Sequence, residues 1–201
     1  MANFKLEVVK CKNCASGLVV ELNDSITYCM SCNNGYEIID GELYSIEINF
    51  ANAALPPEGE LIYKPFWYLK TNVEILVRES DAGFFSRTFG NTNTTSGSVN
   101  FYIPAFSCPI EFTRQLAIAY TQRNPVSSPQ KKSVKITGFN YGKEDARKLA
   151  EFVLISIEAE KKDTMKQFEY RIDFNSFEIL GIPFYKLQNG KLKDAVLGIV
   201  I

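Results

Sequence analysis

Four of the five cysteines in this chain form two C-x-x-C pairs, and this spacing constrains the fold more than any other feature. The pairs are Cys11 with Cys14 and Cys29 with Cys32. A C-x-x-C turn aims two sulfurs at one point, and two such turns at the ends of paired strands complete a tetrahedron of thiolates. We therefore expect residues 1–50 to fold as a small all-β zinc ribbon, with these four cysteines binding one structural Zn²⁺.

The residues inside the ribbon predict strands at residues 18–22 and 43–48, and Asp40-Gly41 predicts a tight hairpin turn before the second of these strands.

Three other uses of paired cysteines compete with zinc. The N-terminus has no signal-peptide pattern and no apolar run approaches a membrane span, so we expect a cytoplasmic, reducing location, which disfavours disulfides. A thioredoxin-like redox pair needs a βαβ context, and none follows either pair. Four thiolates also suit iron, as in a rubredoxin-like site, but zinc is favoured over iron.

The absence of histidine excludes several classes of enzyme. With no His in 201 residues, the chain has no Ser-His-Asp triad, no Cys-His dyad and no His-containing catalytic zinc site. Glycine-rich phosphate-binding motifs are also missing. We therefore expect a protein that is not an enzyme. Thiol chemistry at Cys108 is the one alternative, because a cysteine at a helix N-terminus has a lowered pKa.

The ribbon residues form a longer motif, C-x-x-C-x-x-x-Leu followed by C-x-x-C-x-x-x-Tyr-x-Ile-x-Asp-Gly. Its members here are Cys11, Cys14, Leu18, Cys29, Cys32, Tyr36, Ile38, Asp40 and Gly41. This motif resembles the Trm112-like zinc ribbon, over residues 8–48 only. The resemblance implies a ribbon fold, a bound zinc and a partner-binding role, since members of that family activate or stabilise methyltransferases or are attached to other domains. Ala15 and Asn33 stand where the family usually has glycine.

Charge bears on whether such a ribbon binds nucleic acid or protein. Residues 1–48 contain three lysines against seven acidic residues, a formal charge of −4, and the whole chain has a net charge of −1. An acidic ribbon is a poor phosphate binder. We therefore expect a non-catalytic zinc-ribbon adaptor or assembly subunit that mediates protein–protein interaction. A nucleic-acid- or transcription-associated zinc-ribbon protein is the alternative.

Residues 51–60, rich in small residues and proline, predict a linker, and residues 61–201 predict a second, β-rich α+β domain. Turn residues at 70–72 and at Asn189-Gly190 predict two antiparallel hairpins, 61–79 and 177–201. Both contain a Pro-Phe-aromatic-x-Leu phrase, at residues 65–69 and 183–187, which either reflects a diverged internal repeat or arose by chance. Each proline is expected to bend its strand and turn aromatic side chains into the core. The predicted fold class is α+β.

Two helices are expected between the hairpins. The first is capped by Ser107 or Cys108, has Pro109 in its first turn and ends at Asn124. The second begins near Gly142 and runs to about residue 161. The β-branched stretch 152–157 inside it would also suit a strand.

Two loops supply candidate partner-binding residues. The loop of residues 80–98 is long and rich in Gly, Asn, Thr and Ser, and its aromatic residues either tuck into the core or form a partner-facing patch. They are Phe84, Phe85 and Phe89. The loop of residues 122–135 has no acidic residue, so it is either simply solvated or a contact for an acidic partner or phosphate. Its candidates are Arg123, Lys131 and Lys132.

Overall fold

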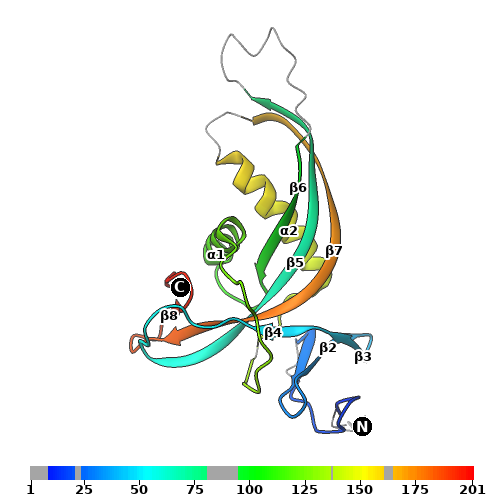
Figure 1. Cartoon of the computed structure of the whole chain (residues 1–201), viewed down its shortest axis with the longest axis vertical. Helices are drawn as coiled ribbons and strands as arrows, with labels where there is room; N and C mark the ends of the chain where they lie inside the picture. The colour runs from blue at the N-terminus through cyan, green and yellow to red at the C-terminus, as the bar shows by residue number, and fades with distance from the viewer. Residues whose placement is uncertain (1–8, 21–23, 81–94, 137, 161–164) are drawn as a thin grey trace, which may run out of the picture.

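The computed structural model describes residues 9–20, 24–80, 95–136, 138–160 and 165–201. It confirms the predicted α+β class: an N-terminal three-stranded antiparallel sheet is followed by a mixed five-stranded sheet with two helices (Figure 1). Among the described helices, none is both long and apolar enough to cross a membrane.

The small sheet has the strand order β1-β2-β3 and contains β1 (Ile26–Cys29), β2 (Asn34–Ile39) and β3 (Glu42–Ile46). The turn between β2 and β3 has positive φ at both Asp40 (51°) and Gly41 (81°), which is the type I′ geometry that the Asp-Gly pair predicts. The strand expected at 18–22 is wrong over its described part, residues 18–20. There the chain turns back at once, and the Leu18 N–H donates to the Val9 carbonyl (2.8 Å).

The strand expected over residues 43–48 is divided between the two sheets. β3 ends at Ile46, and β4 (Ile48–Phe50) pairs in parallel with β7 (Met165–Lys186) of the large sheet. Ile48 and Phe50 are both fully buried there. Burial of these two side chains therefore draws the end of the ribbon into the large sheet.

The large sheet has the order β4-β7-β5-β6, with β8 (Leu192–Asp194) also paired to β7. Its long strands are β5 (Glu60–Ser80), β6 (Thr95–Pro104) and β7. The turn expected at residues 70–72 is wrong, because β5 continues through it with only a register shift between Lys70 and Thr71. Thr71 is buried and its hydroxyl donates to the Val99 carbonyl (2.9 Å), so a polar residue sits inside the ladder instead of ending it.

The second predicted hairpin is present between β7 and β8, although Asn189 lacks the positive φ that a type I′ turn requires. The two prolines of the shared phrase lie in neighbouring strands, with Pro65 opposite Gly181 and Pro183 opposite Tyr63. Pro65 lies directly before Phe66, where the pairing of β5 with β6 begins. Pro183 lies between residues 179–181 of β7, which pair with β4, and residues 184–186, which pair with β8. Both long strands bend in this region (Figure 1).

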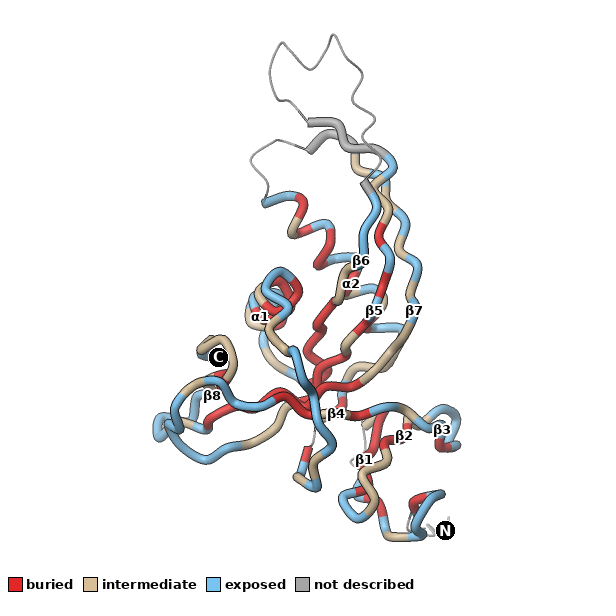
Figure 2. The backbone as a smooth tube through the Cα atoms, in the orientation of Figure 1, coloured by how far each residue is buried: buried red, intermediate tan, exposed pale blue. Residues whose placement is uncertain are grey.

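The aromatic residues after each proline are buried, as predicted. They are Phe66, Trp67, Phe184 and Tyr185. Successive residues of a strand face opposite sides of the sheet, so Trp67 joins one core and Phe66 another. Buried positions concentrate where β4, β5 and β7 meet (Figure 2).

The helices are α1 (Ile110–Arg123) and α2 (Lys143–Ala159). Pro109 occupies the N-cap of α1, so the predicted cap at Ser107 or Cys108 is wrong, whereas Asn124 ends the helix in the left-handed region as expected (φ 42°). Residues 152–157 are helical, so the strand alternative is wrong. α1 covers the edge strand β6, where the Tyr102 N–H donates to Thr121 Oγ1 (3.2 Å).

Candidate metal centre

The two C-x-x-C turns meet at the end of the small sheet and form a cluster of four sulfur atoms that lie within 4.8 Å of one another. Cys11 Sγ is 3.5 Å from Cys32 Sγ, and Cys14 Sγ is 3.5 Å from Cys29 Sγ. A tetrahedral ion with metal–sulfur bonds of about 2.3 Å would place its ligands about 3.8 Å apart. The four cysteines could therefore hold one metal ion with only small adjustments.

Both turns have the same backbone closure. We call residues 11–15 the first knuckle and residues 29–33 the second. The Ala15 N–H donates to the Cys11 carbonyl (2.9 Å), and the Asn33 N–H donates to the Cys29 carbonyl (2.8 Å). Ala15 and Asn33 both have φ 59°, in the left-handed region. Asparagine tolerates this region, whereas alanine is strained there by about 1 kcal/mol.

Polar groups next to the sulfurs favour thiolates. The Tyr36 hydroxyl lies 3.2 Å from Cys11 Sγ, the Asn13 N–H donates to the same sulfur (3.4 Å), and Asn34 Nδ2 donates to Cys32 Sγ (3.3 Å). Such donors orient metal ligands and adjust their basicity. The sequence pattern had included Tyr36 without giving it this role, and it had not singled out Asn13 or Asn34.

The thiols of the cluster differ in acidity. Burial acts to raise the pKa of Cys11, but hydrogen bonds, first from the Tyr36 hydroxyl and then from backbone groups, lower it to about 6. Burial raises the pKa of Cys29 to about 11. A buried thiol of that kind ionises only when a cation is bound beside it. Hydrogen bonds therefore favour the thiolate form of Cys11 and lower the pKa of Cys32 as well, whereas burial disfavours the thiolate form of Cys29.

The second knuckle is attached to the large sheet. The Tyr28 hydroxyl lies 2.6 Å from the Lys132 carbonyl and 2.9 Å from Asn33 Oδ1. The ring of Tyr28 packs edge-on against Phe50 of β4, with centroids 5.5 Å apart. Ser133 Oγ also donates to Asn33 Oδ1 (2.9 Å). These contacts connect the second knuckle to the loop of residues 124–136 and to the main core.

The first knuckle has a different environment. Lys12 Nζ donates to the Leu43 carbonyl (2.8 Å) and pairs with Glu42 (3.6 Å), both at the start of β3. An isolated bridge joins Lys10 to Gly17. These contacts of the first knuckle stay within the ribbon.

The candidate partner-binding residues do not gather at one site in the described structure. Lys131 Nζ donates to the Ile48 carbonyl (2.9 Å), and Lys132 Nζ lies close to the Ala51 carbonyl (3.1 Å) and the Tyr63 hydroxyl (3.0 Å). Both ammonium groups therefore bind the loop to β4 and the chain after it. Phe84, Phe85 and Phe89 lie outside the described residues.

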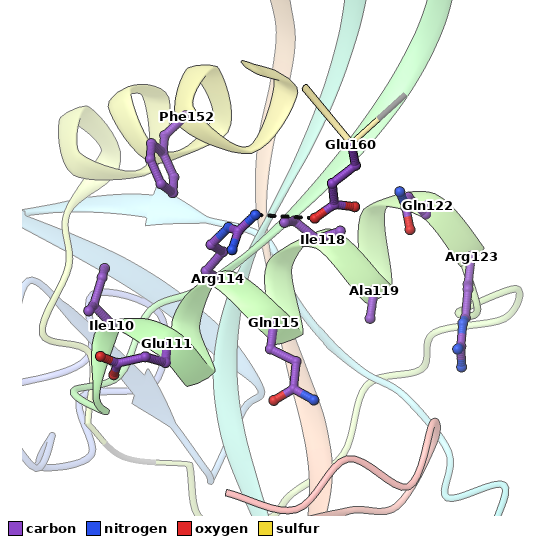
Figure 3. A pocket seen from close by; sticks show the side chains of 10 residues that line it. All are labelled: Ile110, Glu111, Arg114, Gln115, Ile118, Ala119, Gln122, Arg123, Phe152 and Glu160. Carbon is purple, nitrogen blue, oxygen red and sulfur yellow. Dashed lines mark hydrogen bonds and ion pairs between the residues drawn. The ribbon is translucent and has the colours of Figure 1, made fainter. Parts of the chain in front are cut away.

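Arg123 is exposed at the end of α1, beside an open hollow of about 590 Å³ between the two helices (Figure 3). The hollow is lined by Ile110 and Phe152, and the ion pair of Arg114 with Glu160 (3.2 Å) lies across it. Its lining mixes both charges with apolar groups, and no nucleophile or metal-ligand cluster lies among the lining residues. No sequence pattern indicated this surface, because it depends on how α1 and α2 pack.

Cys108 does not have the lowered pKa expected of a thiol at a helix N-terminus. Burial raises its pKa, and this outweighs the opposing effects of the Thr113 hydroxyl, 3.1 Å from the sulfur, and of Lys64. The expectation of an acidic thiol is therefore wrong, because the half-buried side chain loses more solvation than Thr113 and Lys64 compensate.

No protein-family model matches this chain, and no curated protein sequence or solved structure matches it either. The chain has a four-cysteine cluster on a small antiparallel sheet, which is consistent with a zinc ribbon.

Proposed function

We propose that the four cysteines hold one structural zinc ion and that the chain is a non-catalytic adaptor or assembly subunit that binds other proteins. The four-sulfur cluster is the observation that carries this proposal. It would fill every position of a tetrahedral ion with protein thiolates and leave none for water or substrate. A closed site of this kind stabilises a fold and does not perform hydrolysis or transfer chemistry.

Apolar side chains on the ribbon support a protein partner. Val19, Met30 and Tyr44 are 71%, 50% and 53% exposed. Val19 follows the first knuckle, Met30 lies inside the second and Tyr44 lies in β3. Methionine and tyrosine are enriched in protein–protein interfaces, where their apolar surface becomes buried.

The nucleic-acid alternative has less support. The ribbon has an excess of acidic residues, and the ammonium groups of Lys131 and Lys132 have acceptors within the chain. Titration of single- and double-stranded nucleic acid at low salt tests it directly. Strong, salt-dependent binding would favour this alternative over the adaptor.

Elemental analysis of the purified protein tests the metal. We expect one zinc per chain, with the metal lost when Cys29 is changed to serine. Cys108→Ser is the matched control, since this cysteine lies outside the cluster and should leave the zinc content unchanged. A stoichiometric iron content, or no metal in protein prepared without chelators, would contradict the proposed zinc.

Quantitative affinity purification from the organism that encodes the protein tests the adaptor role. We expect a protein that is retained by the wild type to be recovered at least about tenfold less with Tyr44→Asp, since central interface aromatics dominate binding energy. Ile110→Asp is the control, because Ile110 is 61% exposed but lies on α1. Equal recovery with all three forms would show that the ribbon surface does not bind the partner.

A further inference from the structure

The outer edge of β7 is open along half of its length. β5 pairs with β7 from Met165 to Lys186, while on the other side β4 covers residues 179–181 and β8 covers residues 184–186. Within the described chain, no strand pairs with that side of residues 168–178. Figure 1 shows this part of β7 at the margin of the sheet. An open edge with unpaired backbone groups is a template for another strand.

The backbone groups that face this edge belong to apolar residues. The Ile179 N–H donates to the Glu47 carbonyl (2.8 Å), so residue 179 directs its polar groups away from β5. The register then skips Asn175, since Lys70 is opposite Ser176 and Thr71 is opposite Phe174. Because Asn175 is an extra residue in β7, it shifts by one residue the alternation between backbone groups that point toward β5 and those that point away from it. The residues that direct their N–H and C=O groups outward are therefore Tyr170, Ile172 and Phe174.

The segment from Tyr170 to Phe174 is complementary to itself in the antiparallel direction. With Ile172 on a two-fold axis, Tyr170 lies opposite Phe174 of a second copy. Arg171 then lies opposite Asp173 of that copy, and Asp173 opposite its Arg171. Arg171 and Asp173 are exposed, with side-chain exposures of 66% and 58%, and they form an ion pair within the strand (3.2 Å). Both could therefore turn to a neighbouring strand.

We infer that two copies of this chain form a two-fold dimer by antiparallel pairing of β7 through residues 170–174. In a two-fold dimer the same surface meets itself, so every complementary contact occurs twice. Opposite charges directly across two antiparallel strands stabilise the pairing, and like charges destabilise it. The occupant of this edge is therefore a second copy, and Arg171 and Asp173 set the register.

The test measures the mass of the whole protein in solution by light scattering and sedimentation over a range of concentrations. The wild type should approach 45.4 kDa, which is twice the chain mass of 22.7 kDa, and return to 22.7 kDa on dilution. Arg171→Asp and Asp173→Arg should each weaken the dimer by about tenfold or more, because each places like charges opposite one another. The double variant Arg171→Asp/Asp173→Arg should restore it.

A mixture of the two single variants should form a dimer although each is monomeric alone, since both cross-strand pairs then have opposite charges. Arg114→Asp is the matched control, because it breaks an exposed ion pair on the helices and should leave the dimer unchanged. Circular dichroism melts establish that every variant is folded.

Four results would overturn the inference. The wild type could remain at 22.7 kDa at submillimolar concentration. The dimer could survive both single charge reversals, or Arg114→Asp could disrupt it instead. In a register centred on Tyr170, Arg171 would lie opposite Glu169 of the second copy. Asp173→Arg would then leave the dimer intact, and adding it to Arg171→Asp would not restore the dimer. That pattern would overturn the Ile172 axis.

Discussion

The two knuckles have the same backbone geometry but different surroundings. In the second, Tyr28 and Asn33 connect the C-x-x-C turn to Phe50 and to the loop that contains Lys132. The first knuckle makes its described contacts within the ribbon, through Lys12 and the bridge from Lys10. If the four cysteines bind a metal as proposed, we expect the large sheet to order the second knuckle before the metal binds and the first knuckle to depend on the ion.

The hydrophobic clusters next to the two knuckles also differ. The cluster around the sulfurs contains few buried residues, namely Cys11, Leu18, Cys29, Tyr36 and Leu43. Ile26 and Tyr28 of β1 instead belong to the main core, with Trp67 and Phe50. We therefore expect a ribbon with so small a core of its own to depend on the free energy of metal binding, which for structural zinc is on the order of 10 kcal/mol.

Metal removal should separate the two halves most clearly. After chelation we expect amide hydrogen exchange in residues 9–20 to lose at least about a hundredfold in protection, because the metal supplies most of the local stability there. Residues 26–39 should keep part of theirs, since Ile26 and Tyr28 remain packed in the main core. Peptides from β7 are the internal control. Equal loss in both knuckles would show that the ribbon opens as one unit.

Tyr28→Ala should break the attachment of the second knuckle and cost about 3–5 kcal/mol of unfolding free energy, as for other buried aromatic residues. It removes the ring packed on Phe50 and the hydroxyl near the Lys132 carbonyl. Denaturant unfolding measures the change, and Tyr44→Ala is the control because Tyr44 is exposed. If both variants unfold at the wild-type midpoint, the second knuckle is not held by the core.

Tyr36→Phe should weaken metal binding by about 10- to 100-fold, the usual effect of removing a group that supports a ligand. Without the hydroxyl the pKa of Cys11 rises from about 6, so protons compete better for this sulfur near neutral pH. Competition against a coloured chelator measures the affinity, with Tyr44→Phe as control. An affinity equal to wild type would show that Tyr36 serves packing alone.

Glycine substitutions at the last residue of each knuckle should have the smallest effects on stability, and these effects should have opposite signs. Ala15→Gly should stabilise the metal-loaded protein by up to about 1 kcal/mol, since it removes left-handed strain. Asn33→Gly should destabilise it, because Asn33 Oδ1 accepts from Ser133 and lies near the Tyr28 hydroxyl. Thermal melts compare the two. Shifts in the same direction would mean that the knuckles are equivalent.

Much of the fold follows from local sequence. Three correctly predicted features each depend on residues within a few positions of one another. They are the helix α2, the end of α1 at Asn124 and the Asp40-Gly41 turn. The burial of the aromatic residues that follow Pro65 and Pro183 was also predictable, although their placement in adjacent strands was not.

The cysteine spacing by itself determined the set of four candidate metal ligands, because a C-x-x-C turn fixes where its sulfurs point. Only the tertiary structure decided that residues 70–72 continue a strand, that β4 leaves the ribbon and that Lys131 and Lys132 bind carbonyls within the chain. The local sequence around polar residues such as Thr71 predicts a turn. They stay in a strand when residues distant in sequence supply their hydrogen bonds, and no local pattern records those partners.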